Sequence, residues 1–226
     1  MIVGIHQPNY LPYIGFFDKL KKSDIFILYD DAQFSKGDFH HRNKIRTPNG
    51  SKWLTVPVEK KLISINKIRI RNDLLIGNNK WNISHLGDIQ NNYSKAPFYQ
   101  KFITELENIY NEDYDFLVDL NMRLIQFLSD SFNIKTKIVC SSEFGFNSKS
   151  TSKILDLVDA VGGNKYLSGS CGKNYLEIEQ FDRCGIELIF QDFKHPIYDQ
   201  QYNGFMPNMT SLDALLNAGF MGDKYK

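Results

Sequence analysis

The chain has 226 residues, of which 42% are hydrophobic and 23% charged, and its formal net charge is +1 at pH 7. This is an ordinary globular composition, with enough residues to bury one good core or one core plus a small appendage. The near-zero charge argues against non-specific nucleic-acid binding, because no surplus of cations is available to neutralise phosphates. Three cysteines without CxxC spacing argue against a disulfide framework and a structural zinc site. No signal peptide precedes Ile2 and no apolar run approaches membrane-spanning length, so we expect a cytoplasmic protein without membrane insertion.

The first seventeen residues predict a buried strand, a stiff loop and the start of a helix. An apolar run reaches Ile5, two prolines then enclose polar and ring-bearing residues, and Ile14, Phe17 and Leu20 follow one helical turn apart. Ligands of open α/β sheets bind at the carboxyl ends of strands, where such loops lie. The candidate site residues of this loop are therefore His6, Gln7, Asn9 and Tyr10. The structural alternative is that His6 is a hydrogen-bonded residue at the end of a strand.

Residues 25–29 form a compact apolar run that predicts a second buried strand, parallel to the first. Asp30 and Asp31 end this run, and a long polar loop is expected over 32–46. Residues 47–50 have turn chemistry. Alternating patterns at 53–58 and 65–70 predict two antiparallel strands, with a further turn region at 72–79.

The stretch from about 80 to 132 has helical periodicity, with a weak first helix at 81–93 separated by Pro97 from a stronger stripe. A strand at 136–139 and a helix capped by Thr151 follow, and a glycine pair at 162–163 ends that helix. Further strands are expected at 165–167 and 186–190, with a helix near 175–183 between them. Thr210 and Asp213 resemble a capping box at the start of a last helix, and Gly219 ends it.

This order of elements predicts an α/β fold: a mostly parallel, Rossmann-like sheet flanked by helices, with an inserted β-hairpin and helical segment. We expect a single domain over 1–226, with the insertion at about 51–132. In such a sheet the loops after residues 5, 29 and 167 meet at one edge.

The second of these loops supplies both carboxylates and cations. Asp30 could hold Mg²⁺ or orient a histidine, and its alternative is a solvated charge at the end of a strand. A basic cluster suits phosphate recognition, and its alternative is a solvated loop. The binding candidates of this loop are Gln33, Phe34, Lys36, Arg42, Asn43 and Lys44.

The third loop, 168–173, is glycine-rich, follows a strand and precedes a helix, so its backbone can cradle an anion. It lacks the Walker P-loop pattern. Its candidates are Ser168, Gly169 and Lys173, while Cys171 is either a nucleophile or, more often in such positions, a spectator thiol. His195 and Tyr198, beyond the last strand, could add a base and a hydrogen-bonding partner. His6, His195 and a carboxylate lack the spacing of a zinc site, so no metal ligands are assigned.

Several of these motifs together resemble the WbqC-like protein family. They are the stretch from His6 to Lys19, residues 30–36 and 42–45, the Trp53-Leu-Thr-Val-Pro-Val run, Tyr166-Leu-Ser-Gly, the His195-Pro-Ile-Tyr segment, and residues 210–219. The likeness runs nearly from end to end. His41 stands where the family usually has Asn, and Cys171 where Gly is common. Members typically accompany genes for bacterial surface polysaccharides such as O-antigen.

The resemblance and the residues together imply an enzyme of nucleotide-sugar tailoring. It would transfer an acyl or aminoacyl group, glycyl being one candidate, to the amine of a nucleotide-linked amino-deoxy sugar. His6 or His195 would act as the general base, with Asp30 as its partner. Tyr10 or Phe34 would stack on the nucleobase, and ATP and Mg²⁺ stay open as cofactors. One alternative is a nucleotidyltransferase-like or other phosphate-chemistry enzyme, because the layout is similar to HxGH nucleotidyltransferases although HxGH is missing. The other is a non-catalytic binding protein of a polysaccharide pathway.

Overall fold

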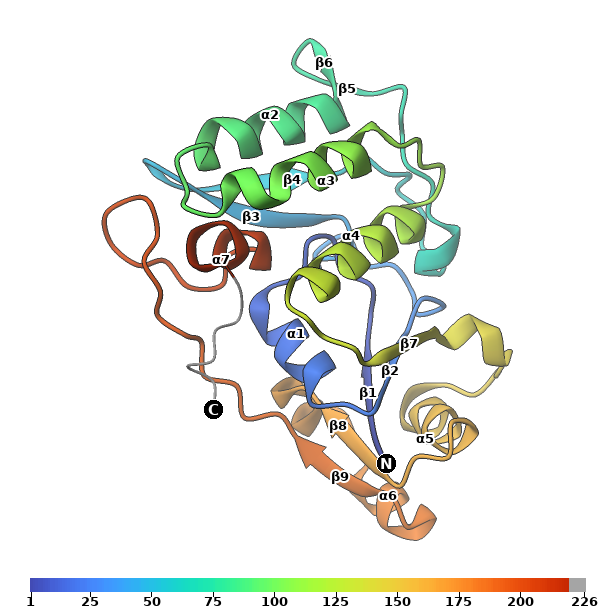
Figure 1. Cartoon of the computed structure of the whole chain (residues 1–226). Helices are drawn as coiled ribbons and strands as arrows, with labels where there is room; N and C mark the ends of the chain where they lie inside the picture. The colour runs from blue at the N-terminus through green and yellow to red at the C-terminus, as the bar shows by residue number, and fades with distance from the viewer. Residues whose placement is uncertain (220–226) are drawn as a thin grey trace. The chain divides into compact units, whose positions relative to one another are not determined.

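The computed structural model describes residues 1–219 (Figure 1). The regular elements, with η denoting short 3₁₀ helices, are β1 (Ile2–His6), α1 (Ile14–Lys21), β2 (Ile25–Leu28), β3 (Arg42–Thr47), β4 (Gly50–Thr55), η1 (Ile65–Lys67), β5 (Leu75–Ile76), β6 (Asn79–Lys80), α2 (Trp81–Tyr93), α3 (Tyr99–Asn111), α4 (Leu117–Ser131), β7 (Lys137–Cys140), η2 (Ser141–Phe144), α5 (Ser150–Ala160), β8 (Lys165–Ser168), η3 (Ser170–Asn174), α6 (Ile178–Cys184), β9 (Glu187–Phe190) and α7 (Ser211–Ala218).

The chain divides into two compact units, each built from three separate segments. Unit 1 comprises Met1–Gln7, Gly15–Ala32 and Ile134–Lys194. Unit 2 comprises Pro8–Ile14, Gln33–Asn133 and the segment that begins at His195. The stretch predicted as an insertion, at about 51–132, falls within unit 2. The expectation of a single domain over the whole chain stays a prediction.

Unit 1 contains a five-stranded sheet whose neighbouring strands are all parallel, in the order β7-β2-β1-β8-β9. This confirms the predicted Rossmann-like α/β fold. Counted along the chain, the strands have the spatial order 3-2-1-4-5, so the order reverses between β1 and β8. Crevices for ligands form at such a reversal, outside the carboxyl ends of the strands.

Helices cover both faces of this sheet, because alternate residues of a strand point to opposite sides. Ile5 and Ile27 belong to a core that also contains Leu157 of α5 and Phe181 of α6. On the other face, Phe26 of β2 packs against Phe16 of α1, with ring centroids 5.2 Å apart. Burial on both faces explains why β1 and β2 read as continuous apolar runs.

Unit 2 contains an antiparallel hairpin of β3 and β4, in which Lys44 lies opposite Trp53 and Thr47 opposite Gly50. The predicted pairing of 53–58 with 65–70 is therefore wrong. Residues 65–67 form η1, and only an isolated bridge joins Val58 to Ile70. The tight turn at 47–50, where Gly50 has a φ of 124°, closes a hairpin with the strand before it. The loop predicted over 32–46 is therefore wrong from Arg42 onward, where β3 begins, because the many cations of this strand conceal its alternation.

The predicted ends of the last helix are confirmed, whereas the Thr151 cap is wrong. Thr210 accepts a hydrogen bond from the backbone N–H of Leu212 (3.3 Å), and Gly219 adopts the left-handed conformation that ends α7. Helix α5 begins one residue before Thr151, and Lys149 is its N-cap. The Thr151 hydroxyl instead accepts a hydrogen bond from the backbone of Glu177 (3.2 Å), at the start of α6. Its role is to connect two helices.

Candidate functional site

Three of the predicted site residues lie along the carboxyl edge of the unit 1 sheet. His6 is the last residue of β1, Ser168 is the last residue of β8, and Asp30 follows two residues after β2. These strands are neighbours and run parallel, so their carboxyl ends meet at one edge. The structure thus brings together the ends of the three strands that the sequence singled out. His6 and Ser168 flank the reversal of strand order.

His6 is half-buried at this edge. Its ring meets the ring of Phe16 edge-on, with centroids 5.0 Å apart, and its Nδ1 lies 2.9 Å from the carbonyl oxygen of Gln7. When Nδ1–H donates to that carbonyl, the neutral ring carries its lone pair on Nε2. The backbone carbonyl of His6 accepts from the N–H of Tyr29 (2.8 Å), which fixes the end of β1 against β2.

Asp30 is buried, with 3% of its surface exposed. One carboxylate oxygen accepts from the Ser141 hydroxyl (3.0 Å) and the Ser142 N–H (2.9 Å), and the other accepts from the Ser142 hydroxyl (2.6 Å). Asp31 forms an ion pair with Lys153 of α5. These contacts tie η2 and α5 to the end of β2. The geometry gives both carboxylates a structural role.

The glycine-rich loop closes tightly on the end of β8. A Cβ on Gly172 would lie 2.1 Å from the Ser168 hydroxyl, so only glycine fits there, whereas Gly169 has open space around it. The Lys173 ammonium lies 5.2 Å from the ring of Phe190, at the end of β9. The loop continues as η3 before α6, so the predicted helix starts three residues later than expected. Cys171 is exposed.

Lys19 also lies at this edge, although it is not among the site residues predicted from the sequence. It is 2% exposed, and its ammonium donates to the carbonyl of Ile5 (2.6 Å). The paired register of β1 and β8 ends at Gly4 and Leu167. The carbonyl of His6 faces β2, and successive carbonyls of a strand point to opposite sides, so the carbonyl of Ile5 faces β8. No backbone N–H of β8 is paired with it, and the Lys19 ammonium fills that place. Burial lowers the pKa of Lys19 to about 7.

A sequence signal for Lys19 existed. Phe16, Lys19, Leu20 and Ser23 recur at helical spacing, so Lys19 belongs to the apolar stripe of α1. Its position in the last turn of α1 also suits a cation that complements the helix dipole, and that second signal points to an exposed side chain. A lysine inside such a stripe indicates either a stem that reaches solvent or a buried amine with a specific acceptor.

Most aromatic and amide candidates of unit 2 are buried in its core. The Tyr10 hydroxyl lies 2.9 Å from Nδ1 of His85 and also bonds the Tyr110 hydroxyl. Phe34 is 3% exposed and packs against His40 and His41. These placements leave neither the Tyr10 nor the Phe34 ring with an exposed face on which a nucleobase could stack. Asn43 donates to the carbonyl of Leu11 (2.6 Å), Asn9 is also buried, and Gln33 is exposed.

His195 and Tyr198 form local contacts in unit 2. Nδ1 of His195 lies 2.8 Å from the carbonyl of Pro196, and Nε2 accepts from the backbone N–H of Asn208 (3.2 Å). Both ring nitrogens are therefore engaged with the backbone. Tyr198 donates to the buried carboxylate of Asp213 (2.7 Å).

Asp213, predicted as a capping residue, is instead the centre of a buried network in unit 2. Its carboxylate also accepts from the Tyr93 hydroxyl (2.7 Å) and the Gln200 amide (2.8 Å), so it ties the segment around Tyr198 and Gln200 to α2. Burial raises the pKa of Asp213, against the hydrogen bonds that lower it.

The cations of the hairpin remain accessible. The Arg42 guanidinium lies 4.6 Å and the Lys44 ammonium 4.8 Å from the centre of the Trp53 ring, and Lys36 is exposed on the preceding loop.

Within residues 1–219, no group of three His, Cys, Asp or Glu side chains is placed to hold a metal ion.

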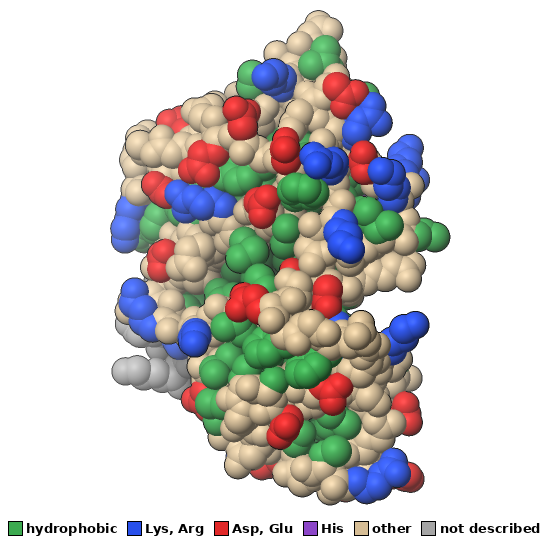
Figure 2. Space-filling view, turned by 90° about the vertical axis from the view of Figure 1, so that its right-hand side faces the viewer, with side chains coloured by type: hydrophobic (Ala, Val, Ile, Leu, Met, Phe, Trp, Pro, Cys, Tyr) green, Lys and Arg blue, Asp and Glu red, His purple; other side chains and the backbone are tan. Residues whose placement is uncertain are grey.

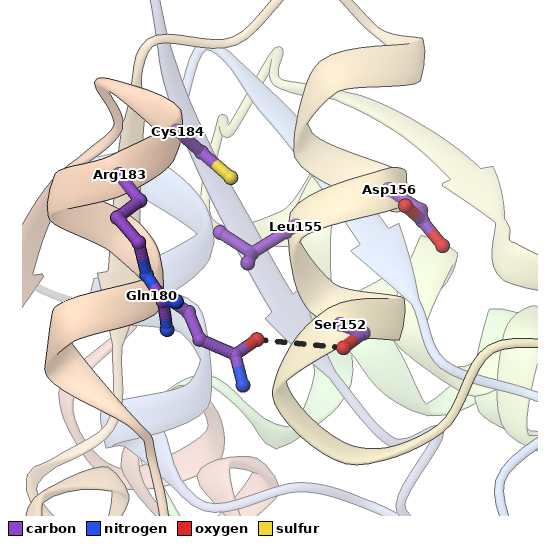
Figure 3. Close-up of a pocket in the computed structure, with 6 residues that line it drawn as sticks. All are labelled: Ser152, Leu155, Asp156, Gln180, Arg183 and Cys184. Atoms are coloured by element: carbon purple, nitrogen blue, oxygen red, sulfur yellow. Dashed lines mark hydrogen bonds between the residues drawn. The ribbon is translucent and has the colours of Figure 1, made fainter.

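A depression of about 450 Å³ lies between α5 and α6 of unit 1. Figure 3 shows Ser152 hydrogen-bonded to Gln180 across it (3.4 Å), with Arg183 and Cys184 on the same side as Gln180. None of the residues predicted from the sequence lines it.

Figure 2 shows acidic and basic side chains interspersed on the side of the molecule in view, with hydrophobic groups between them. This agrees with the near-zero net charge. Within residues 1–219, none of the helices has the length and apolar content required to cross a bilayer.

Fold and edge geometry define an α/β protein that presents polar side chains where the strand order of a parallel sheet reverses. A model of the WbqC-like protein family matches residues 7–224, and the chain therefore belongs to this family. It is 32% identical over 225 residues to the uncharacterized protein Rv1507c of Mycobacterium tuberculosis. The aligned residues cover 99% of this chain and 96% of that protein. No solved structure matches the chain significantly.

Proposed function

We propose that this protein transfers an acyl or aminoacyl group, with glycyl as one candidate, to the amine of a nucleotide-linked amino-deoxy sugar used for bacterial surface polysaccharide such as O-antigen. One observation carries the proposal. His6 and the 168–173 loop end neighbouring parallel strands on the two sides of the strand-order reversal. Small molecules with phosphate groups bind at this position in open α/β sheets.

The glycine turn would hold the phosphates. The space around Gly169 lets a ligand approach the backbone closely, and the required glycine at 172 keeps the turn compact. Lys173 adds a cation at the same turn. Asp30 supports the edge through Ser141 and Ser142, so we assign it a positioning role and no proton transfer.

His6 would act as the general base. The sugar amine must lose a proton before it is nucleophilic, and Nε2 of His6 takes that proton. The neutral nitrogen then attacks the carbonyl carbon of an activated acyl donor, a thioester or an acyl phosphate made with ATP. A C–N bond forms, the bond to the leaving group breaks, and the leaving group departs with its electron pair and takes up the second proton of the nitrogen. A positioned base contributes about 10²- to 10⁴-fold to such a rate.

The test is product analysis by mass spectrometry. The purified protein is incubated with nucleotide-linked amino sugars, and with either ATP, Mg²⁺ and single amino acids or acyl thioesters. The expected result is a mass gain of one acyl group on the sugar amine for one of these donors. No mass gain with any combination, or pyrophosphate release without an amide product, would overturn the proposal.

The His6→Gln variant tests the assigned base. We expect kcat to fall about 10²-fold or more while the unfolding midpoint stays near that of the parent. Asp182→Asn, at an exposed position of α6 in the same unit, is the matched control and should retain full activity. Full activity of His6→Gln would exclude His6 as the base.

A further inference from the structure

The β3–β4 hairpin of unit 2 presents one apolar and one polar side. Ile45 and Leu54 point to the buried side, at 0% and 1% exposure. Because side chains alternate along a strand, Arg42 and Lys44 point to the other side, where Trp53 lies opposite Lys44. We call this outer side, together with Phe39 of the preceding loop, the hairpin face.

Two large rings are exposed on the hairpin face. Trp53 is 40% and Phe39 is 46% exposed, and their centroids lie 6.0 Å apart with planes inclined by 35°. Exposed rings that lie side by side offer an apolar platform whose contact with water is unfavourable. A flat ligand with an apolar face, such as a sugar ring with its C–H groups, would cover them.

Two cations lie over this platform without acidic partners. Neither Arg42 nor Lys44 belongs to an ion pair formed within residues 1–219. Arg42 donates from Nη2 to the carbonyl of Gly37 (2.7 Å), which orients the guanidinium and uses one of its five N–H groups. Lys52, on the opposite side of the same hairpin, is in contrast paired with Asp88 (2.6 Å). The hairpin face therefore favours an anion.

We infer that the hairpin face binds a phosphorylated saccharide, with the sugar ring on Trp53 and Phe39 and the phosphate at Arg42 and Lys44. The rings alone would accept any flat apolar group, and the cations alone would accept any anion. A sugar that carries a phosphate satisfies both at once. The inference concerns unit 2 and holds whether or not the acyl transfer proposed for unit 1 occurs.

Intrinsic fluorescence tests this directly, because the chain has two tryptophans and the other, Trp81, is 4% exposed. The probes are glucose 1-phosphate and UDP-glucose, with glucose, UDP and inorganic phosphate as controls. We expect a saturable fluorescence change with both sugar phosphates, weaker binding of UDP and phosphate, and no response to glucose. No saturable change at millimolar sugar phosphate, or equal binding of inorganic phosphate, would overturn the inference.

Calorimetric titration of variants locates the site. Trp53→Ala should weaken glucose 1-phosphate binding about tenfold or more, as expected for loss of one stacked ring. Arg42→Gln combined with Lys44→Gln should abolish it. Lys52→Gln, on the opposite side of the hairpin, and Asp182→Asn, exposed in unit 1, should bind as the parent does. Unchanged affinity in Trp53→Ala, or equal loss in Lys52→Gln or Asp182→Asn, would place the ligand elsewhere and contradict the inference.

Discussion

The charged residues at the carboxyl edge of unit 1 and on the hairpin face of unit 2 differ in what they contact. At the edge, Asp30 is buried against two serines, Asp31 is paired with Lys153, and Lys19 is buried against a backbone carbonyl. On the hairpin face, Arg42 and Lys44 lie over a half-exposed ring. The sequence suggested chemistry for both sets, and the structure separates charges that hold the fold from charges that can meet a ligand.

The physical reason is desolvation. A charge removed from water is tolerated only where a partner or a set of hydrogen bonds replaces the lost hydration. Buried charges are therefore committed to the fold, while a half-exposed cation keeps unused donors. Three substitutions, ordered from the largest expected effect to the smallest, test whether this separation is real.

Asp30→Ala should have the largest effect, lowering the free energy of unfolding by about 3 kcal/mol, because it removes the buried acceptor of three hydrogen bonds from Ser141 and Ser142. Urea denaturation measures the change. Asp182→Ala, exposed on α6, should change stability by no more than about 0.5 kcal/mol. If Asp30→Ala were as stable as the parent and yet inactive, Asp30 would be a catalytic group and the comparison would fail.

Lys19→Met should remove a pH dependence of stability. The folded-state pKa is about 7, below that of the unfolded chain, so between pH 7 and about 10 the unfolded chain binds more protons. The parent should therefore gain stability as pH rises through this window, by at most about 1.4 kcal/mol per pH unit, relative to the variant. Urea denaturation of both proteins at several pH values gives the difference. Parallel stability curves would show that Lys19 is not buried as an amine.

Lys44→Ala should have the smallest effect on the fold. An exposed cation above a tryptophan contributes about 0.5–1 kcal/mol, so the midpoint of urea unfolding should shift little. Lys52→Ala, which breaks an exposed ion pair on the other side of the hairpin, should cost a similar amount. A loss above about 2 kcal/mol in Lys44→Ala would mean that the fold depends on this cation.

The sequence by itself determined the α/β class, the parallel strands and the strand ends at which His6, Asp30 and Ser168 lie. Apolar runs bounded by polar residues are local signals, and so are the Thr210 cap and the glycine at 219. These features depend on residues that are close in the chain, which is why periodicity and turn chemistry find them.

Only the tertiary structure decided the strand order, the pairing of β3 with β4 and the partners of the charged residues. Asp30 meets Ser141 across 111 residues of sequence, and Lys19 turns inward because the β1–β8 ladder ends beside it. The exposure of Trp53 likewise depends on which side of the hairpin the core covers. Whether a charge is buried or a ring is left in water is set by segments that are distant in the chain, and local patterns do not contain that information.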